Sequence, residues 1–127
     1  MSMNILIVDD YMVNRIILKE IIEDTGYVVF EATNGKEALD LLQDNKIDLI
    51  LMDIEMPVMN GFEATKAIKN DKNQLIKRIK VIGITAHDIN DSSLEISDFS
   101  IFDGFISKPF TLEYVLECVK KNLEIVA

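Results

Sequence analysis

The sequence contains one cysteine, one histidine, two prolines and no tryptophan among its 127 residues. The single cysteine, Cys118, excludes an internal disulfide and indicates a reducing compartment. The single histidine argues against a metal site or proton relay built from several histidines. Basic residues are also scarce, since 13 Lys and Arg stand against 22 Asp and Glu, for a formal net charge of −9. This excess of negative charge disfavours direct binding to nucleic acid or to an anionic membrane.

Long apolar runs are missing as well, and none approaches the roughly 20 residues that a membrane-spanning helix needs. The N-terminal Met-Ser-Met-Asn has no basic region and no long apolar stretch, so we expect no signal peptide. No Gly-rich phosphate cradle is present, which argues against a nucleotide site. We therefore expect a cytoplasmic protein that is not inserted in a membrane. The length suits a single domain, which we predict to span residues 1–127.

What the sequence does contain is a series of short apolar runs that end on polar residues. The most pronounced run is 49–52, which leads directly into Asp53. Three others end in the same way: 5–8 on Asp9 and Asp10, 81–84 on Thr85, and 104–107 on Lys108. Runs of this length are typical of strands that are buried on both faces. Segment 27–31 is β-branched and aromatic, which predicts a fifth strand.

Segments with a helical period separate these strands. In the first, the apolar residues Val13, Ile16, Ile17, Ile21 and Ile22 alternate with a polar side made of Arg15, Lys19, Glu20 and Glu23. Further helices are predicted after Asn34 and Asn60, around 94–99, and over 112–123. Such alternation requires parallel strands joined by right-handed crossovers. The sequence therefore predicts an α/β fold, a three-layer sandwich around a five-stranded parallel sheet.

Because parallel strands end at one edge of a sheet, we expect Asp9, Asp10 and Asp53 to lie close together. Carboxylates about 5 Å apart repel each other by about 3 kcal/mol per pair at an effective dielectric near 20. A cation would relieve this repulsion, and a set of oxygen ligands favours Mg²⁺ or Mn²⁺ over zinc. We predict that Asp10 and Asp53 bind the ion with Asp9 close by, and that the backbone carbonyl of Glu55 and waters complete its ligands.

A carboxylate beside a divalent cation can also act as a nucleophile toward phosphorus. The predicted nucleophile is Asp53, while the hydroxyl of Thr85 and the ammonium of Lys108 would stabilise the transferred phosphoryl group. Two other functions use similar parts. One is an Mg²⁺-dependent phosphatase with an Asp nucleophile, although the second Asp common in such enzymes is replaced here by Glu55. The other is an interaction module whose acidic site is vestigial.

The same residues lie in motifs found together in one family. They are Asp9-Asp10, the segment MDIEMPVMNG over 52–61, Thr85-Ala86 and Lys108-Pro109-Phe110. In this order and spacing the chain resembles, over essentially its full length, the receiver domain of two-component response regulators. Asn14-Arg15 and segment 52–65 look closest to receivers attached to hybrid sensor histidine kinases.

The resemblance implies a flavodoxin-like, doubly wound sheet with strand order 2-1-3-4-5 and a cis Lys108–Pro109 peptide. It implies that Asp53 is the phosphoacceptor, served by a histidine kinase or a histidine phosphotransfer protein. Such a domain is not an enzyme in its own right, but it assists its own phosphorylation and dephosphorylation. Phosphorylation is implied to draw in Thr85 and turn Phe105 inward. The fourth predicted helix, around 94–99, would then change conformation together with the fifth strand and the last helix. An output partner, which the sequence does not identify, would bind the changed surface.

Overall fold

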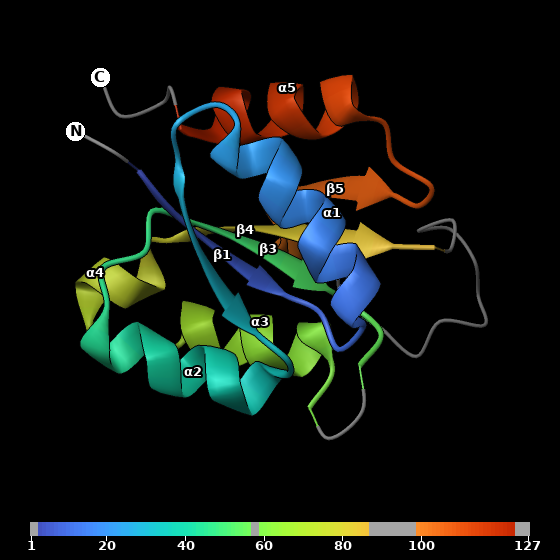
Figure 1. The fold of residues 1–127 in the computed structure, drawn as a ribbon. Helices are drawn as coiled ribbons and strands as arrows, with labels where there is room; N and C mark the ends of the chain where they lie inside the picture. Colours follow the sequence, from blue (N-terminus) through green and yellow to red (C-terminus); the bar gives the residue numbers. More distant parts are fainter. Residues whose placement is uncertain (1–2, 57–58, 87–98, 124–127) are drawn as a thin grey trace.

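Five parallel strands form a single sheet at the centre of the molecule (Figure 1). The structure is a computed structural model and describes residues 3–56, 59–86 and 99–123. The strands are β1 (Asn4–Val8), β2 (Val28–Ala32), β3 (Leu49–Asp53), β4 (Lys80–Thr85) and β5 (Gly104–Ser107). They are arranged in the order β2-β1-β3-β4-β5, and every neighbouring pair is parallel. The predicted fold class and strand order are therefore confirmed.

Helices cover both faces of this sheet and complete the three layers. The first face is covered by α1 (Met12–Glu23) and α5 (Leu112–Leu123), and the other by α2 (Gly35–Asp44) and α3 (Gly61–Lys69) (Figure 1). A short helix α4 (Gln74–Lys77) precedes β4, and the 3₁₀ turn η1 (Phe99–Ile101) precedes β5. Within the described ranges, no helix has the length and apolar character needed to cross a membrane.

Side chains of the strands alternate between two apolar cores. In β1, Ile5 and Ile7 pack in the core beneath α1 and α5, whereas Leu6 and Val8 pack in the core beneath α2 and α3. All five residues of β3 are buried. Burial on both faces explains why the strands read as unbroken apolar runs.

Helix α1 buries only part of the face that its sequence predicted. Ile22 is completely buried and Ile21 packs against the core, as expected. Val13, Ile16 and Ile17 were also expected inside, but they are 45%, 46% and 42% exposed, and Leu18 is completely buried in addition. Apolar residues surround most of this helix, so the helical period does not by itself select the face that packs on the sheet.

The other differences lie in short elements and helix ends. Helix α4 has only four residues, too few for a periodic signal, and it is capped by the side chain of Asn73. The capping box predicted at Asn60 and Glu63 is present, but the Glu37 carboxylate binds Thr33 rather than the amide of Asn34. The helix predicted around 94–99 lies outside the described residues, apart from the start of η1.

Candidate functional site

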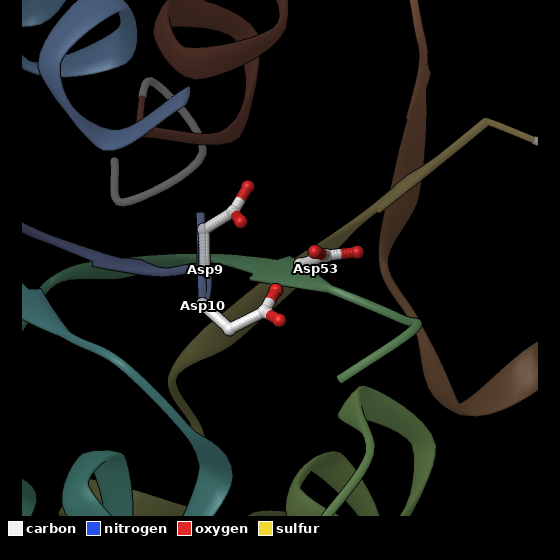
Figure 2. Close-up of side chains that lie close together, drawn as sticks. All are labelled: Asp9, Asp10 and Asp53. Carbon is white, nitrogen blue, oxygen red and sulfur yellow. The ribbon is translucent and has the colours of Figure 1, made fainter. Parts of the chain in front are cut away.

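Three aspartates meet where β1 and β3 end. Asp53 is the last residue of β3 and is 4% exposed, while Asp9 follows β1 directly and is fully buried. Asp10 is exposed. One carboxylate oxygen from each lies within 4.8 Å of the other two, and Figure 2 shows the three groups gathered around one space. The expected proximity is thus present, because strands β1 and β3 are neighbours in the sheet.

Each buried carboxylate accepts a hydrogen bond through its Oδ1 from the turn that follows its strand. Asp9 Oδ1 accepts a hydrogen bond from the backbone amide of Tyr11 at 2.9 Å. Asp53 Oδ1 likewise accepts one from the amide of Glu55 at 3.1 Å. Among the described residues, the fully buried Asp9 Oδ2 accepts no hydrogen bond. A buried carboxylate oxygen without a hydrogen-bond donor destabilises the folded state, and a bound cation would remove this cost.

One ammonium group faces the cluster. Lys108 Nζ lies 3.6 Å from Asp53 Oδ2 and 3.9 Å from Asp9 Oδ2. These distances give charge attraction rather than short hydrogen bonds. Since three carboxylates face the Lys108 ammonium, they outnumber its charge whenever all three are ionised.

Thr85 ends β4, the neighbour of β3, and Lys108 follows β5, the next strand beyond β4. Thr85 is the last residue of β4 and is buried, and β4 pairs with β3 along the segment that ends at Asp53. The backbone amide of Lys108 donates to the Thr85 carbonyl at 2.8 Å. The predicted cis Lys108–Pro109 peptide is present. The sheet therefore brings the predicted hydroxyl and ammonium residues to the same edge as the carboxylates.

The pKa of Asp53 is raised from its ordinary value of 3.8 to about 7, mainly by burial and next by the neighbouring charge of Asp9. Lys108 and the Glu55 amide oppose the rise and are already included in this value. A carboxyl group in this state holds a proton about half the time near neutral pH. A proton and a metal cation would therefore compete for Asp53.

The ligand types of the cluster fit a hard divalent cation. They are all oxygens, one of them buried without a donor, and the exposed Asp10 leaves one side open to water. Mg²⁺ favours a few carboxylates supplemented by water, whereas zinc favours nitrogen and sulfur ligands. The Glu55 carbonyl stays a predicted ligand, and the backbone amide of the same residue donates to Asp53 Oδ1.

Gly61 is a site residue that sequence reasoning missed. The start of α3 lies against the end of β3, where the Gly61 amide donates to the Ile54 carbonyl at 2.9 Å. A Cβ at Gly61 would overlap the carbonyl oxygen of Asp53 and lie 2.7 Å from the Cα of Ile54. Only glycine permits this approach, so α3 fixes the backbone of Asp53 directly.

Arg15 is a second residue whose position the sequence did not reveal. It was predicted on the polar side of α1, but its side chain is only 14% exposed. Its Nη1 donates to the backbone carbonyl of Asp9 at 2.9 Å, and its Nε lies 3.3 Å from Glu31 Oε1. No motif signals such a contact, because it joins a side chain to a backbone atom.

The predicted switch residue Phe105 is half-buried in β5. Its ring lies 5.3 Å from that of Phe102, centroid to centroid, at an interplanar angle of 51°. A Cβ at Gly83 would lie 3.1 Å from both rings, so the missing side chain makes room for this aromatic pair. The Tyr114 hydroxyl donates to the Phe105 carbonyl at 3.2 Å. A switching role for Phe105 stays a prediction.

Comparison with known proteins identifies one family. Residues 5–120 match the model of the family described as response regulator receiver domain. The chain is 35% identical over 123 residues to the polar-differentiation response regulator DivK of Brucella anthropi, which covers 97% of this chain and 98% of that relative.

Solved structures show the same similarity. The signal receiver domain of a signal transduction histidine kinase from Syntrophus aciditrophicus is 32% identical with a TM-score of 0.88, covering 98% of this chain and 92% of that one. The response regulator TrrA from Thermotoga maritima, in complex with Mg²⁺-BeF, is 36% identical with a TM-score of 0.81, covering 96% of this chain and 100% of that one. Receivers of separate regulators and of kinases are both similar to this chain.

Proposed function

Because this chain belongs to the family of response regulator receiver domains, we propose that Asp53 is the phosphoacceptor of a single receiver domain spanning residues 1–127. The family acts in two-component signalling, in which such a domain receives a phosphoryl group and passes on a change of shape. The observation that supports Asp53 most strongly is its placement. It is buried beside Asp9 and Asp10, with the Lys108 ammonium 3.6 Å from its Oδ2.

The donor is a phosphohistidine on a histidine kinase or a histidine phosphotransfer protein. An oxygen of the ionised Asp53 carboxylate attacks the phosphorus, the N–P bond breaks, and the imidazole leaves with the electron pair and takes up a proton. The Lys108 ammonium and the Thr85 hydroxyl contact the oxygens of the transferred group, where negative charge is spread in the transition state. The same residues position water for the later hydrolysis, so the domain assists its own phosphorylation and dephosphorylation.

Asp10 and Asp53 are the proposed ligands of Mg²⁺, with Asp9 close by and the Glu55 carbonyl completing the protein's share. The buried Asp9 oxygen that lacks a donor supports this assignment, as does the bound Mg²⁺ of the similar regulator TrrA. When bound, the ion supplies charge neutralisation at the transferred phosphoryl group. Mn²⁺ offers the same preference for oxygen ligands and is the alternative ion.

The exposed apolar side of α1 is the proposed docking surface for the donor protein. Tyr11, Met12, Val13, Ile16 and Ile17, here called the α1 patch, are between 42% and 60% exposed. The patch begins one residue after Asp10, so a protein that covers it reaches the acidic cluster. Contiguous exposed apolar side chains of this kind mark protein-binding surfaces. Ile17→Ser should slow transfer from a phosphorylated donor protein and leave phosphorylation by acetyl phosphate unchanged.

Phosphorylation is proposed to act on Thr85 and Phe105. A phosphoryl group on Asp53 would attract the Thr85 hydroxyl, and the half-buried Phe105 ring would turn inward into the space vacated. An output partner would read the resulting change at β5 and α5. Equal burial of Phe105 with and without a beryllofluoride phosphate mimic would count against this role.

The test of the proposed function is intact mass after incubation with acetyl phosphate and Mg²⁺. The native chain should gain one phosphoryl group, Asp53→Asn should gain none, and the control Asp48→Asn should react like the native chain. A phosphorylated Asp53→Asn chain would overturn the assignment. A phosphomonoester such as p-nitrophenyl phosphate should show no repeated turnover, whereas many turnovers per chain would favour a phosphatase.

A further inference from the structure

Arg15 connects helix α1, strand β2 and the backbone that follows β1 beside the acidic cluster. It lies one turn into α1, its Nη1 donates to the Asp9 carbonyl at 2.9 Å, and its Nε pairs with Glu31 Oε1 of β2 at 3.3 Å. The Arg15 side chain is 14% exposed and its bond to the Asp9 carbonyl is partly buried, whereas the Glu31 side chain is 35% exposed and its pair with Arg15 is open to solvent. A planar guanidinium that binds two acceptors has little freedom to move, which makes it a rigid connection.

The carbonyl that Arg15 binds controls the direction of the next residue. The carbonyl of Asp9 and the amide of Asp10 belong to one planar peptide group. Holding that carbonyl therefore fixes the plane from which the Asp10 side chain leaves the backbone. The other end of Asp9 is also held, because its amide donates to the Ala32 carbonyl of β2 at 3.1 Å. Asp10 itself is exposed to solvent.

We propose that Arg15, braced by Glu31, is the positioning residue that aims Asp10 at the divalent cation. This inference rests on the proposed function, since it concerns the same metal site. Arg15 touches neither the ion nor the phosphoryl group and acts through the Asp9–Asp10 peptide. Groups that orient metal ligands in this way typically contribute roughly 10-fold or more to metal affinity.

The charge of Arg15 and its positioning role predict opposite effects on Mg²⁺ affinity, so one measurement distinguishes them. Arg15 carries positive charge close to the site, so removing that charge would by Coulomb's law strengthen the binding of a cation. If Arg15 positions Asp10, removing it weakens binding instead. The sign of the change in Mg²⁺ affinity therefore separates the two roles.

Lys19 supplies a matched control on the same helix. Its Nζ lies 3.6 Å from Glu31 Oε2, so it pairs with the same carboxylate and carries the same charge as Arg15. Its side chain is 41% exposed, and within the described part of the chain it forms an ion pair with Glu31. Lys19→Met thus repeats the loss of charge next to Glu31 without removing the bond to the Asp9 carbonyl.

The experiment is a titration with Mg²⁺ alone, followed by the amide NMR signals of residues around Asp10 and Asp53. Arg15→Met should weaken Mg²⁺ binding roughly 10-fold, and Lys19→Met should change it less than about twofold. Arg15→Lys, which can hold one acceptor but not both, should fall between native and Arg15→Met. Glu31→Gln should weaken binding about two- to threefold, because Arg15 still binds the Asp9 carbonyl but loses its ion pair with Glu31.

A second measurement uses acetyl phosphate. The Mg²⁺ concentration for half-maximal rate should rise in the same order of variants, while the rate at saturating Mg²⁺ stays near native.

Unchanged or tighter Mg²⁺ binding in a folded Arg15→Met chain would overturn the inference. Should that variant fail to fold, Arg15→Lys and Glu31→Gln decide, and native affinity in both would overturn it equally. A native chain that binds no Mg²⁺ at millimolar concentration would contradict the metal site itself. The failure of the positioning role is thereby distinguished from the failure of the proposed function.

Discussion

One aspartate, Asp48, directly precedes strand β3 and another, Asp53, ends it, and the surroundings of the two differ. Asp48 precedes the strand and is half-buried, its Oδ2 accepts the Asn4 amide at 2.8 Å, and its own amide donates to the Asn4 carbonyl at 2.8 Å. Asp53 ends the strand almost completely buried, and it shares its space with two other carboxylates. The first carboxylate joins two strands and stabilises the fold. The second is held where its charge is unfavourable, which is expected of a group kept for binding and chemistry.

The largest expected difference is between the stability costs of adding a methyl group at Gly61, which contacts the end of β3, and at Gly104, at the start of β5. Gly61→Ala places a Cβ against the backbone of Asp53, and we expect it to cost about 3 kcal/mol or more of unfolding free energy. Gly104, at the start of β5, provides the control because a Cβ there would meet only the tip of Ile82 at 3.2 Å. Gly104→Ala should cost about 1 kcal/mol at most. Urea unfolding of both variants measures the difference, and equal costs would show that the close approach at Asp53 is relieved without strain.

Neutralising Asp53 and neutralising Asp48 should change the unfolding free energy in opposite directions. Without Mg²⁺ at pH 8, Asp53→Asn should raise the unfolding free energy by on the order of 2 kcal/mol, because it removes a buried charge from a crowded site. Asp48→Asn should lower it by about 1 kcal/mol, because a charged acceptor of the Asn4 amide becomes a neutral one. Chemical denaturation checks both values. A loss of stability in Asp53→Asn would mean that its carboxylate is satisfied in the folded chain.

The gain from Asp53→Asn should depend on pH with a definite sign. The pKa of Asp53 is raised to about 7 in the folded chain from 3.8, so between these pH values the folded state keeps a proton that the unfolded state has released. Unfolding free energy contributed by this group therefore falls as the pH rises from about 4 to about 7. The stability difference between Asp53→Asn and the native chain should widen across this window and level off above it. A difference that does not vary with pH would contradict the raised pKa.

Much of this arrangement could be predicted from the sequence, because it follows from where strands end. Short apolar runs that finish on Asp9, Asp53, Thr85 and Lys108 predict parallel strands with one polar edge. Parallel pairing then places these residues together whatever the loops between them do. The strand order and the cis peptide came from the resemblance to a family, and the structure has both.

What the sequence could not show depends on the directions of individual side chains. Helix α1 has apolar residues on most sides, so the face that buries Leu18 rather than Ile17 becomes evident only from its packing. The contact of Arg15 also depends on the direction of its side chain, which extends from the predicted polar side of α1 to the Asp9 carbonyl. The contact of Gly61 with the Asp53 backbone likewise depends on a distance between two elements. Helical period and motif spacing do not report such distances.

The account rests on the claim that the crowded end of β3 is relieved by a hard dication, and unfolding with and without millimolar Mg²⁺ tests that claim most directly. We predict that Mg²⁺ raises the unfolding free energy of the native chain and of Asp48→Asn by about 1 kcal/mol. The same Mg²⁺ should leave Asp53→Asn nearly unchanged. Equal stabilisation of all three chains, or none in the native chain, would contradict the account.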